Sequence, residues 1–299
     1  MIPGIGVPII LVRASALYPF TSFTFTNCSI TGQNGPTLAN MQSAYSATSW
    51  TQNTSYLNIG AFQGYQKWTV PKTGTYRFDI AGAGGGIPSY APSYQGLGVR
   101  AQADIALTSG EFIIIAVGQL GGAGTYSSGG GGGTFIVRNT GSAALLIAGG
   151  AGGAYAFSDY RANSNASVTT SGNTPAGGYT TNGASGGGGF SSAGQTGYGG
   201  STGGGGFNNG LIGGGACSAP TTGLGSFGGG GGGEWCYYGS GGGGGGYSGG
   251  GGGTGGAGGS AGAYAVGGGG SYNIGTATNV TFTSTYNTSD GYATITFLA

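Results

Sequence analysis

Side chains that commonly perform chemistry are scarce in this sequence. Histidine is absent, which removes the commonest general base and the commonest metal ligand. The carboxylates are spread along the chain, at Asp79, Asp104, Glu111, Asp159, Glu234 and Asp290. Asp79 and Asp104 lie in strand-like segments, where a structural ion pair with Arg77 or Arg100 is a simpler interpretation than acid–base catalysis. We therefore expect no catalytic residue, no cofactor and no enzyme activity.

The cysteines give no clear metal site either. The chain has three cysteines, Cys28, Cys217 and Cys236, so at least one of them has no disulfide partner within the chain. Cys217 and Cys236 could form a disulfide or remain buried thiols, and the sequence leaves both alternatives open. Zinc ligation by three widely separated cysteines without histidine is disfavoured. Spacings of the type G-x-G-x-x-G carry no information among 79 glycines, so we expect no metal and no nucleotide site.

A local cluster of aromatic residues surrounds the last cysteine. Trp235, Tyr237 and Tyr238 flank Cys236 in a region otherwise poor in chemical groups. Such a cluster is a candidate contact surface, because aromatic faces stack on sugar rings and anchor protein interfaces. The simpler alternative is an aromatic plug that caps the neighbouring glycine-rich region.

Composition excludes several classes of function. Glycine supplies 79 of 299 residues, where average usage would give about 21, at roughly 7%. Charged side chains make up 4% of the chain and the net charge is +1, so we expect no nucleic-acid partner. Disordered chains combine low hydrophobicity with high net charge, and the charge is missing here. The longest apolar segment, residues 2–12, is too short to span a bilayer and contains Pro3 and Pro8.

The apolar N-terminal segment suggests assembly. We expect residues 1–20 to form an extended arm that docks into another copy or another subunit, in a homo-oligomer. An equally good alternative is an edge strand of the chain's own sandwich. The candidate assembly residues are Ile5, Val7, Ile9, Ile10 and Val12.

Short strand-like segments dominate the next part of the chain. Residues 21–160 alternate apolar and polar positions over short runs separated by Pro- and Gly-containing turns, which predicts a β-sandwich. The last strands must pair with something, because a lone hairpin is marginal in water, so we expect residues 276–299 to complete the same sheets. The predicted hairpins are 65–70 with 75–80, 99–107 with 112–117, and 134–137 with 143–148.

The region between these strands, residues 161–275, is rich in glycine, and we predict that it forms a bundle of polyproline-II-type helices. Polyglycine in this conformation has three residues per turn and no internal hydrogen bonds, so its N–H and C=O groups need lateral partners. Without Cβ atoms, neighbouring rods can approach closely enough to supply them. Substitutions along such a rod should be tolerated with a rhythm of three residues. The alternatives are a flexible linker and a flat β stack.

The sequence contains the short motifs FTNCSITG at 25–32, GPTL at 35–38, SAY at 43–45, GYQKWTVP at 64–71, GTY at 74–76 and AGAGGG at 81–86. These motifs resemble the extracellular glycine-rich domain of the anaplastic lymphoma kinase receptor family, and similar segments occur in glycine-rich viral and bacterial surface proteins. The resemblance implies a tumour-necrosis-factor-like, jelly-roll β-sandwich joined to a bundle of polyglycine helices, with essentially no α-helix. It covers roughly residues 20–150.

This sequence departs from the receptor pattern at one cysteine. The family places a partner for Cys28 shortly after Pro-Thr-Leu, but Ala39, Asn40 and Met41 follow Leu38 here. Together with the retained Met1, this favours folding in the cytosol, and no kinase motif or membrane span is expected.

These observations favour a structural or adhesive virion protein that acts by rigid display and by protein or glycan contact. Candidates are a capsid-associated fibre, a tail-fibre tip and a decoration protein of a phage or a large DNA virus. Its expected location is the virion, and its expected partners are other virion subunits through the N-terminal arm and a host-surface glycan or protein. The alternatives are an extracellular receptor-like binding module at the cell surface and a self-assembling filament or surface-layer subunit.

Overall fold

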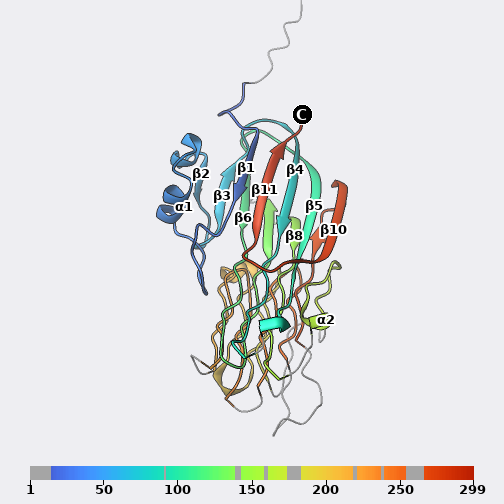
Figure 1. Cartoon of the computed structure of the whole chain (residues 1–299). Coiled ribbons are helices and arrows are strands. Elements are labelled where there is room, and N and C mark those ends of the chain that lie inside the picture. The colour runs from blue at the N-terminus through green and yellow to red at the C-terminus, as the bar shows by residue number, and fades with distance from the viewer. Residues whose placement is uncertain are drawn as a thin grey trace, which may run out of the picture.

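The computed structural model describes the chain as an all-β sandwich above a layer of glycine-rich tracts (Figure 1). Two antiparallel sheets form the sandwich, and helix is almost absent, as expected from the sequence. The described residues are 15–90, 92–138, 143–157, 161–173, 183–217, 221–236, 239–253 and 266–299. The residues of the predicted N-terminal arm, Ile5, Val7, Ile9, Ile10 and Val12, lie outside them.

Strands from both ends of the chain meet in the first sheet. Its order is β1 (Ser22–Phe25), β11 (Tyr292–Phe297), β4 (Gly74–Ala81), β5 (Gly98–Leu107) and β10 (Thr278–Asn287). The C-terminal strand β11 lies between β1 and β4 and pairs with both, so it connects the first strand to the rest of the sheet. The expectation that the last strands complete the sandwich is confirmed.

The second sheet faces the first. Its order is β2 (Leu57–Ile59), β3 (Gln66–Thr69), β6 (Phe112–Ala116), β7 (Thr134–Arg138), β8 (Ala143–Ala148) and β9 (Tyr272–Asn273). A core of fully buried side chains fills the space between the sheets. Trp68 of β3 meets Tyr76 of β4 edge to face, with ring centroids 5.7 Å apart.

Two of the three predicted hairpins are wrong, although their strands exist. β3 and β4 belong to different sheets, and so do β5 and β6. The short turns after Val70 and Leu107 therefore cross from one sheet to the other. Sequence periodicity identifies the inward face of each strand but not its partner, and here the inward faces of consecutive strands pack against each other. The third hairpin, β7 with β8, is confirmed.

The helices are short and lie outside the two sheets, although Met41 and Trp50 pack into the sandwich core. α1 (Leu38–Ala44) begins after Thr37, whose hydroxyl accepts the Asn40 N–H in a capping box. The others are α2 (Arg161–Ser164) and the 3₁₀ turns Ser49–Gln52, Pro92–Tyr94, Tyr198–Gly200 and Phe207–Asn209. Among the described residues, no helix combines the length and apolarity needed to cross a membrane.

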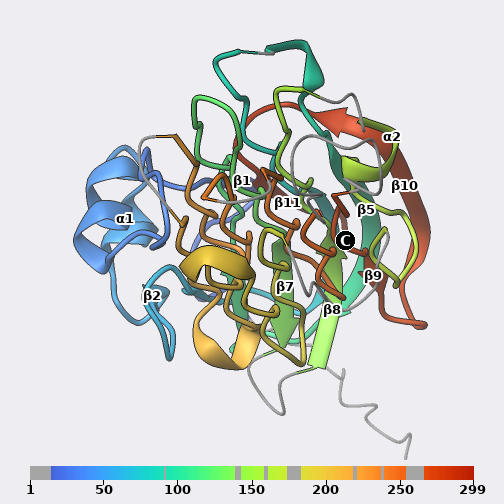
Figure 2. The ribbon, with the colours of Figure 1, turned by 90° about the horizontal axis from the view of Figure 1, so that it is seen from below.

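Glycine-rich tracts lie side by side beneath the sandwich and belong to neither helix nor sheet (Figures 1 and 2). We call them the glycine bundle. They come from the predicted region 161–275 and also from the connections between sandwich strands. The earlier tracts that take part in the same hydrogen-bond network are residues 82–86, 118–122, 127–133 and 149–154.

The tract 241–246 shows how the bundle is held together. The N–H groups of Gly242 and Gly245 donate to the carbonyls of Ser128 and Gly131, at 3.0 Å each. Both partners advance by three residues, so the two tracts run parallel and make one contact per turn. This is the repeat of a polyproline-II helix with three residues per turn.

The other N–H groups of this tract point to two further neighbours with the same period. Gly243 and Gly246 donate to Ser185 and Gly188, at 2.9 and 3.2 Å. Gly244 and then Tyr247 donate to residues 267 and 270, at 3.0 and 2.8 Å. Successive N–H groups of this tract thus donate to three parallel neighbours in turn, so that each neighbour accepts from every third residue.

The carbonyls of the same tract accept from antiparallel neighbours. Gly242 and Gly245 accept from residues 153 and 150, at 2.8 Å each. Gly241 and Gly244 accept from residues 253 and 250, at 3.1 and 2.8 Å, and Gly243 accepts from residue 231 at 2.8 Å. The rod is therefore surrounded on all sides, as the predicted packing of polyproline-II-type helices requires.

This packing leaves no room for side chains in the tract. A Cβ atom built on Gly244 would lie 2.2 Å from the carbonyl oxygen of Gly150, and one on Gly245 would lie 1.9 Å from that of Gly228. All six positions of 241–246 have a backbone oxygen within 2.4 Å of such a Cβ. We therefore do not expect every third position of this tract to tolerate a side chain, because neighbouring tracts enclose it on all sides.

Candidate contact surface at the far end of the glycine bundle

The aromatic residues that follow glycine tracts divide between the two ends of the bundle. Phe190, Phe207 and Tyr247 pack at the junction with the sandwich, in a buried cluster that includes Phe227 and Tyr65. The hydroxyl of Tyr65 donates to the carbonyl of Phe207, and the two rings stack with centroids 4.8 Å apart. These residues plug the near end of the bundle.

Trp235 lies at the opposite end. It follows a tract that starts next to Phe227 at the junction and runs away from the sandwich. Tyr126 precedes the tract that leads into β7, and Tyr155 follows the tract that leaves β8, so both lie at the same far end. The two alternatives drawn from the sequence, a plug and a contact surface, both concern Trp235 and therefore this far end.

Five rings from four loops gather at this end, and we call them the far-end aromatic cluster: Tyr90, Tyr126, Tyr155, Phe157 and Trp235. The Trp235 ring lies 4.7 Å from Tyr126, 5.7 Å from Phe157 and 5.8 Å from Tyr155, between centroids.

Part of this cluster faces solvent. Tyr90 is 67% exposed and Phe157 is 57% exposed, whereas Tyr155 is buried beneath them. Trp235 and Tyr126 are half-buried. Large apolar rings that remain exposed next to supporting rings form a preorganised apolar surface. Of the residues predicted for this surface, Trp235 takes part, and Tyr237 and Tyr238 lie outside the described residues.

A disulfide between Cys217 and Cys236 fastens this end. It decides between the alternatives that the sequence left open, and it joins the tract ending at Cys217 to the loop that carries Trp235. The Cys217 Sγ atom also accepts the backbone N–H groups of Trp235 and Cys236, at 3.2 and 3.1 Å. Cys28 is free and buried, and burial raises the pKa of its thiol.

Asp79 and Asp104 each form an ion pair with an arginine of a neighbouring strand. Arg77 of β4 donates two hydrogen bonds, of 2.7 and 2.8 Å, to the carboxylate of Asp104 on the neighbouring strand β5. Arg100 holds Asp79 in the same bidentate way, at 2.7 and 2.6 Å. The Arg77 guanidinium holds the pKa of the Asp104 carboxyl below its usual value, chiefly through those hydrogen bonds. The expected ion pairs are confirmed.

No family model matches the chain.

A leukocyte tyrosine kinase receptor from Mus musculus is 32% identical over 102 residues.

The match covers 33% of this chain and 11% of the receptor, so this chain spans about a ninth of the length of the relative it matches. It supports a distant relationship to the receptor family named above for about a third of the chain, and it assigns no activity.

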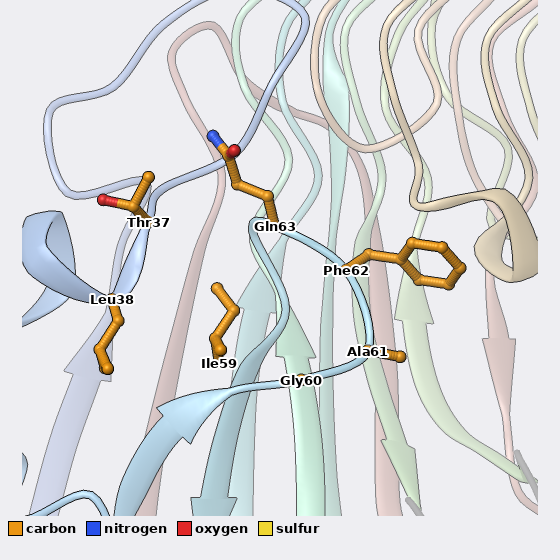
Figure 3. A pocket seen from close by; sticks show the side chains of 7 residues that line it. All are labelled: Thr37, Leu38, Ile59, Gly60, Ala61, Phe62 and Gln63. Atoms are coloured by element: carbon orange, nitrogen blue, oxygen red, sulfur yellow. The ribbon is translucent and has the colours of Figure 1, made fainter.

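A hollow lies beside the junction of sandwich and bundle (Figure 3). It encloses about 340 Å³ next to α1 and the turn between β2 and β3. Phe62, 38% exposed, separates it from a smaller hollow of about 70 Å³. The residues around the larger hollow are Thr37, Leu38, Ile59, Gly60, Ala61, Phe62 and Gln63. None of them is charged, so this hollow offers shape and amide or hydroxyl groups rather than reactive chemistry.

Sequence reasoning missed most of the far-end aromatic cluster. Tyr90, Tyr126 and Phe157 lie in three loops that are distant in sequence, and only the arrangement of the tracts brings them to Trp235. A usable signal existed, because each of these aromatics lies within a few residues of the end of a glycine-rich tract that begins or ends at a strand.

Proposed function

We propose that this chain is a rigid adhesive module whose glycine bundle displays the far-end aromatic cluster to a neutral carbohydrate. The observation that carries the proposal is the exposure of Tyr90 and Phe157 on a surface supported by Trp235 and Tyr126. The C–H face of a sugar ring is apolar and stacks on aromatic faces, and a preformed surface loses little entropy on binding.

The charge of this region favours a neutral ligand. Glu234 is the only charged residue between positions 162 and 289, and it is buried. Residues 162–289 therefore offer no cation to a polyanionic glycan and no exposed carboxylate to a cationic ligand. Neutral sugars match a surface of aromatic rings, because their C–H faces need no charged partner.

A location on a virion, as a fibre, fibre tip or decoration protein, is part of this proposal. It is supported by the composition: rigid uncharged tracts and a small number of reactive groups suit a display element. Assembly through residues 1–20 with other virion subunits or further copies is also part of it. Deleting residues 2–12 should abolish oligomers in light-scattering measurements while leaving the melting temperature unchanged; normal oligomers would remove the arm from the proposal.

The ligand is tested by binding to immobilised neutral oligosaccharides. Phe157→Ala and Trp235→Ala should each weaken binding by about tenfold or more, as expected for aromatic anchors at the centre of an interface. Phe62→Ala, at an exposed ring beside the junction, is the matched control and should change binding by less than about twofold. Equal losses in all three variants, or no binding to any glycan, would contradict the proposal.

The matched receptor favours a second candidate, an extracellular module that binds a protein through the same surface. The two are distinguished on cells to which the chain adheres. Enzymatic removal of surface glycans should abolish adhesion if the ligand is a carbohydrate. Protein binding would survive deglycosylation and disappear after mild proteolysis of the cell surface.

A further inference from the structure

A compact group of metal-ligating atoms lies directly behind the far-end aromatic cluster. The group consists of one ligand atom each from Cys217, Glu234 and Cys236, and these atoms all lie within 4.8 Å of one another. The group joins two tracts of the bundle, because Cys217 ends one and Glu234 ends another. We propose that Cys217, Glu234 and Cys236 bind a zinc ion when the disulfide is reduced.

The spacing of the ligands fits a tetrahedral zinc ion. With Zn–S bonds of about 2.3 Å and Zn–O bonds of about 2.1 Å, neighbouring sulfur and oxygen ligands lie roughly 3.6 Å apart. The Cys217 Sγ atom and the Glu234 Oε1 atom are 4.0 Å apart. The Cα atoms of Cys217 and Cys236 are 6.1 Å apart, so side-chain rotation alone can separate the sulfurs to the roughly 3.8 Å that zinc requires.

The backbone around the group is already arranged for a thiolate. Two N–H groups, from Trp235 and Cys236, point at the Cys217 Sγ atom. Hydrogen bonds to the charged form of a group favour that form, so these donors stabilise the deprotonated sulfur that binds metal. The Glu234 Oε2 atom accepts the N–H of Gly239 at 2.8 Å, which orients the other carboxylate oxygen toward the sulfurs.

Glu234 contributes a buried carboxylate to this group. A divalent cation bound beside it would give its Oε1 atom an ionic partner, while Oε2 keeps the hydrogen bond from Gly239. Two thiolates with one carboxylate form a soft donor set that favours zinc over magnesium or calcium.

The chemical balance requires a reductant of the dithiol class. A dithiol donates two electrons and two protons to the Cys217–Cys236 bond and becomes a disulfide itself. The two released thiols then lose their protons to water as two Zn–S bonds form, and Glu234 supplies the Zn–O bond. Water takes the fourth position, as at other zinc sites with three protein ligands.

The inference does not depend on the proposed carbohydrate ligand, and it is tested on the full chain with Co²⁺ as a spectroscopic probe. The chain reduced under anaerobic conditions should bind one equivalent of Co²⁺ with a thiolate-to-cobalt charge-transfer absorption. Zn²⁺ should displace the probe. The oxidised chain, which needs no mutation, should show neither effect. If the reduced chain shows no more thiolate absorption than the oxidised chain, the proposal is wrong.

Two variants assign the ligands. Cys217→Ser should abolish the charge-transfer band, and Glu234→Gln should weaken Co²⁺ binding by at least about tenfold while leaving the melting temperature of the oxidised chain within a few degrees of the wild type. Cys28→Ser removes the remaining thiol and should bind as the wild type does. Unchanged binding in Glu234→Gln, or a band retained in Cys217→Ser, would overturn the assignment.

Discussion

The sandwich is stabilised by side chains: Trp68, Phe78 and Ile115 are fully buried between two sheets whose backbones pair within their own layer. In the glycine bundle the contacts are made by the backbone itself. The tract 241–246 has no side chains, and its N–H and C=O groups bond surrounding tracts in rotation. Removing atoms should therefore damage the first region, and adding atoms should damage the second.

The largest effect is expected from adding a side chain at the centre of the bundle. Gly244→Val places its Cβ 2.2 Å from the Gly150 carbonyl oxygen, so tracts must separate and lose lateral hydrogen bonds. Overpacking and unsatisfied buried amides together should cost about 4 kcal/mol or more in the free energy of unfolding. Chemical denaturation followed by tryptophan fluorescence measures this cost.

Gly275→Val is the matched control, because no atom lies within 4 Å of a Cβ there and its φ is outside the left-handed region. It should change stability by less than about 1 kcal/mol. Equal stability of the two variants would mean that the bundle is not close-packed in solution.

Removing a side chain from the sandwich should have the next largest effect. Phe78 in β4 is fully buried, and Phe78→Ala should cost about 3–5 kcal/mol through lost burial and the cavity that remains. The same denaturation experiment applies. A cost below about 1 kcal/mol would show that the sandwich core is not the rigid packing seen here.

Removing a side chain from the bundle should have a smaller effect. Ala151 lies fully buried in the tract that leaves β8, where its backbone bonds to Ala83 and Gly131. Ala151→Gly loses one methyl group and adds backbone freedom to the unfolded chain, which together should cost about 1–2 kcal/mol. A cost equal to that of Phe78→Ala would contradict the contrast between the two regions.

Acid pH should have the smallest effect of the four, through an ion pair of the sandwich. The Arg77 guanidinium lowers the pKa of Asp104 in the folded chain, so this pair stabilises the fold above the unfolded pKa of about 3.9. That contribution is lost as the pH falls through the lower folded value. Asp104→Asn should flatten the pH dependence of the melting temperature below pH 4. An unchanged profile would mean that this pair contributes nothing measurable.

The sequence predicts the architecture well because both regions follow local rules. Alternating strands indicate a sandwich, and uncharged glycine tracts indicate laterally bonded rods. Strand pairing was harder, since the turn after Val70 allows either a hairpin or a crossing between sheets. The six-sided packing of 241–246 was also out of reach, because it depends on which tracts become neighbours. The ring contacts of Trp235 with Tyr126 and Phe157 depend on the same arrangement.

The hydrogen bonds of tract 241–246 point to successive neighbours around its axis, and this arrangement has a spectroscopic consequence. Circular dichroism responds to helices and strands and would record this region as coil, although its amides are bonded and buried. Amide hydrogen exchange responds to protection instead, and Gly242 to Gly246 should exchange as slowly as the central strands of the sandwich. Uncharged glycine tracts enclosed between strands can therefore be well ordered although they contain almost no helix or strand.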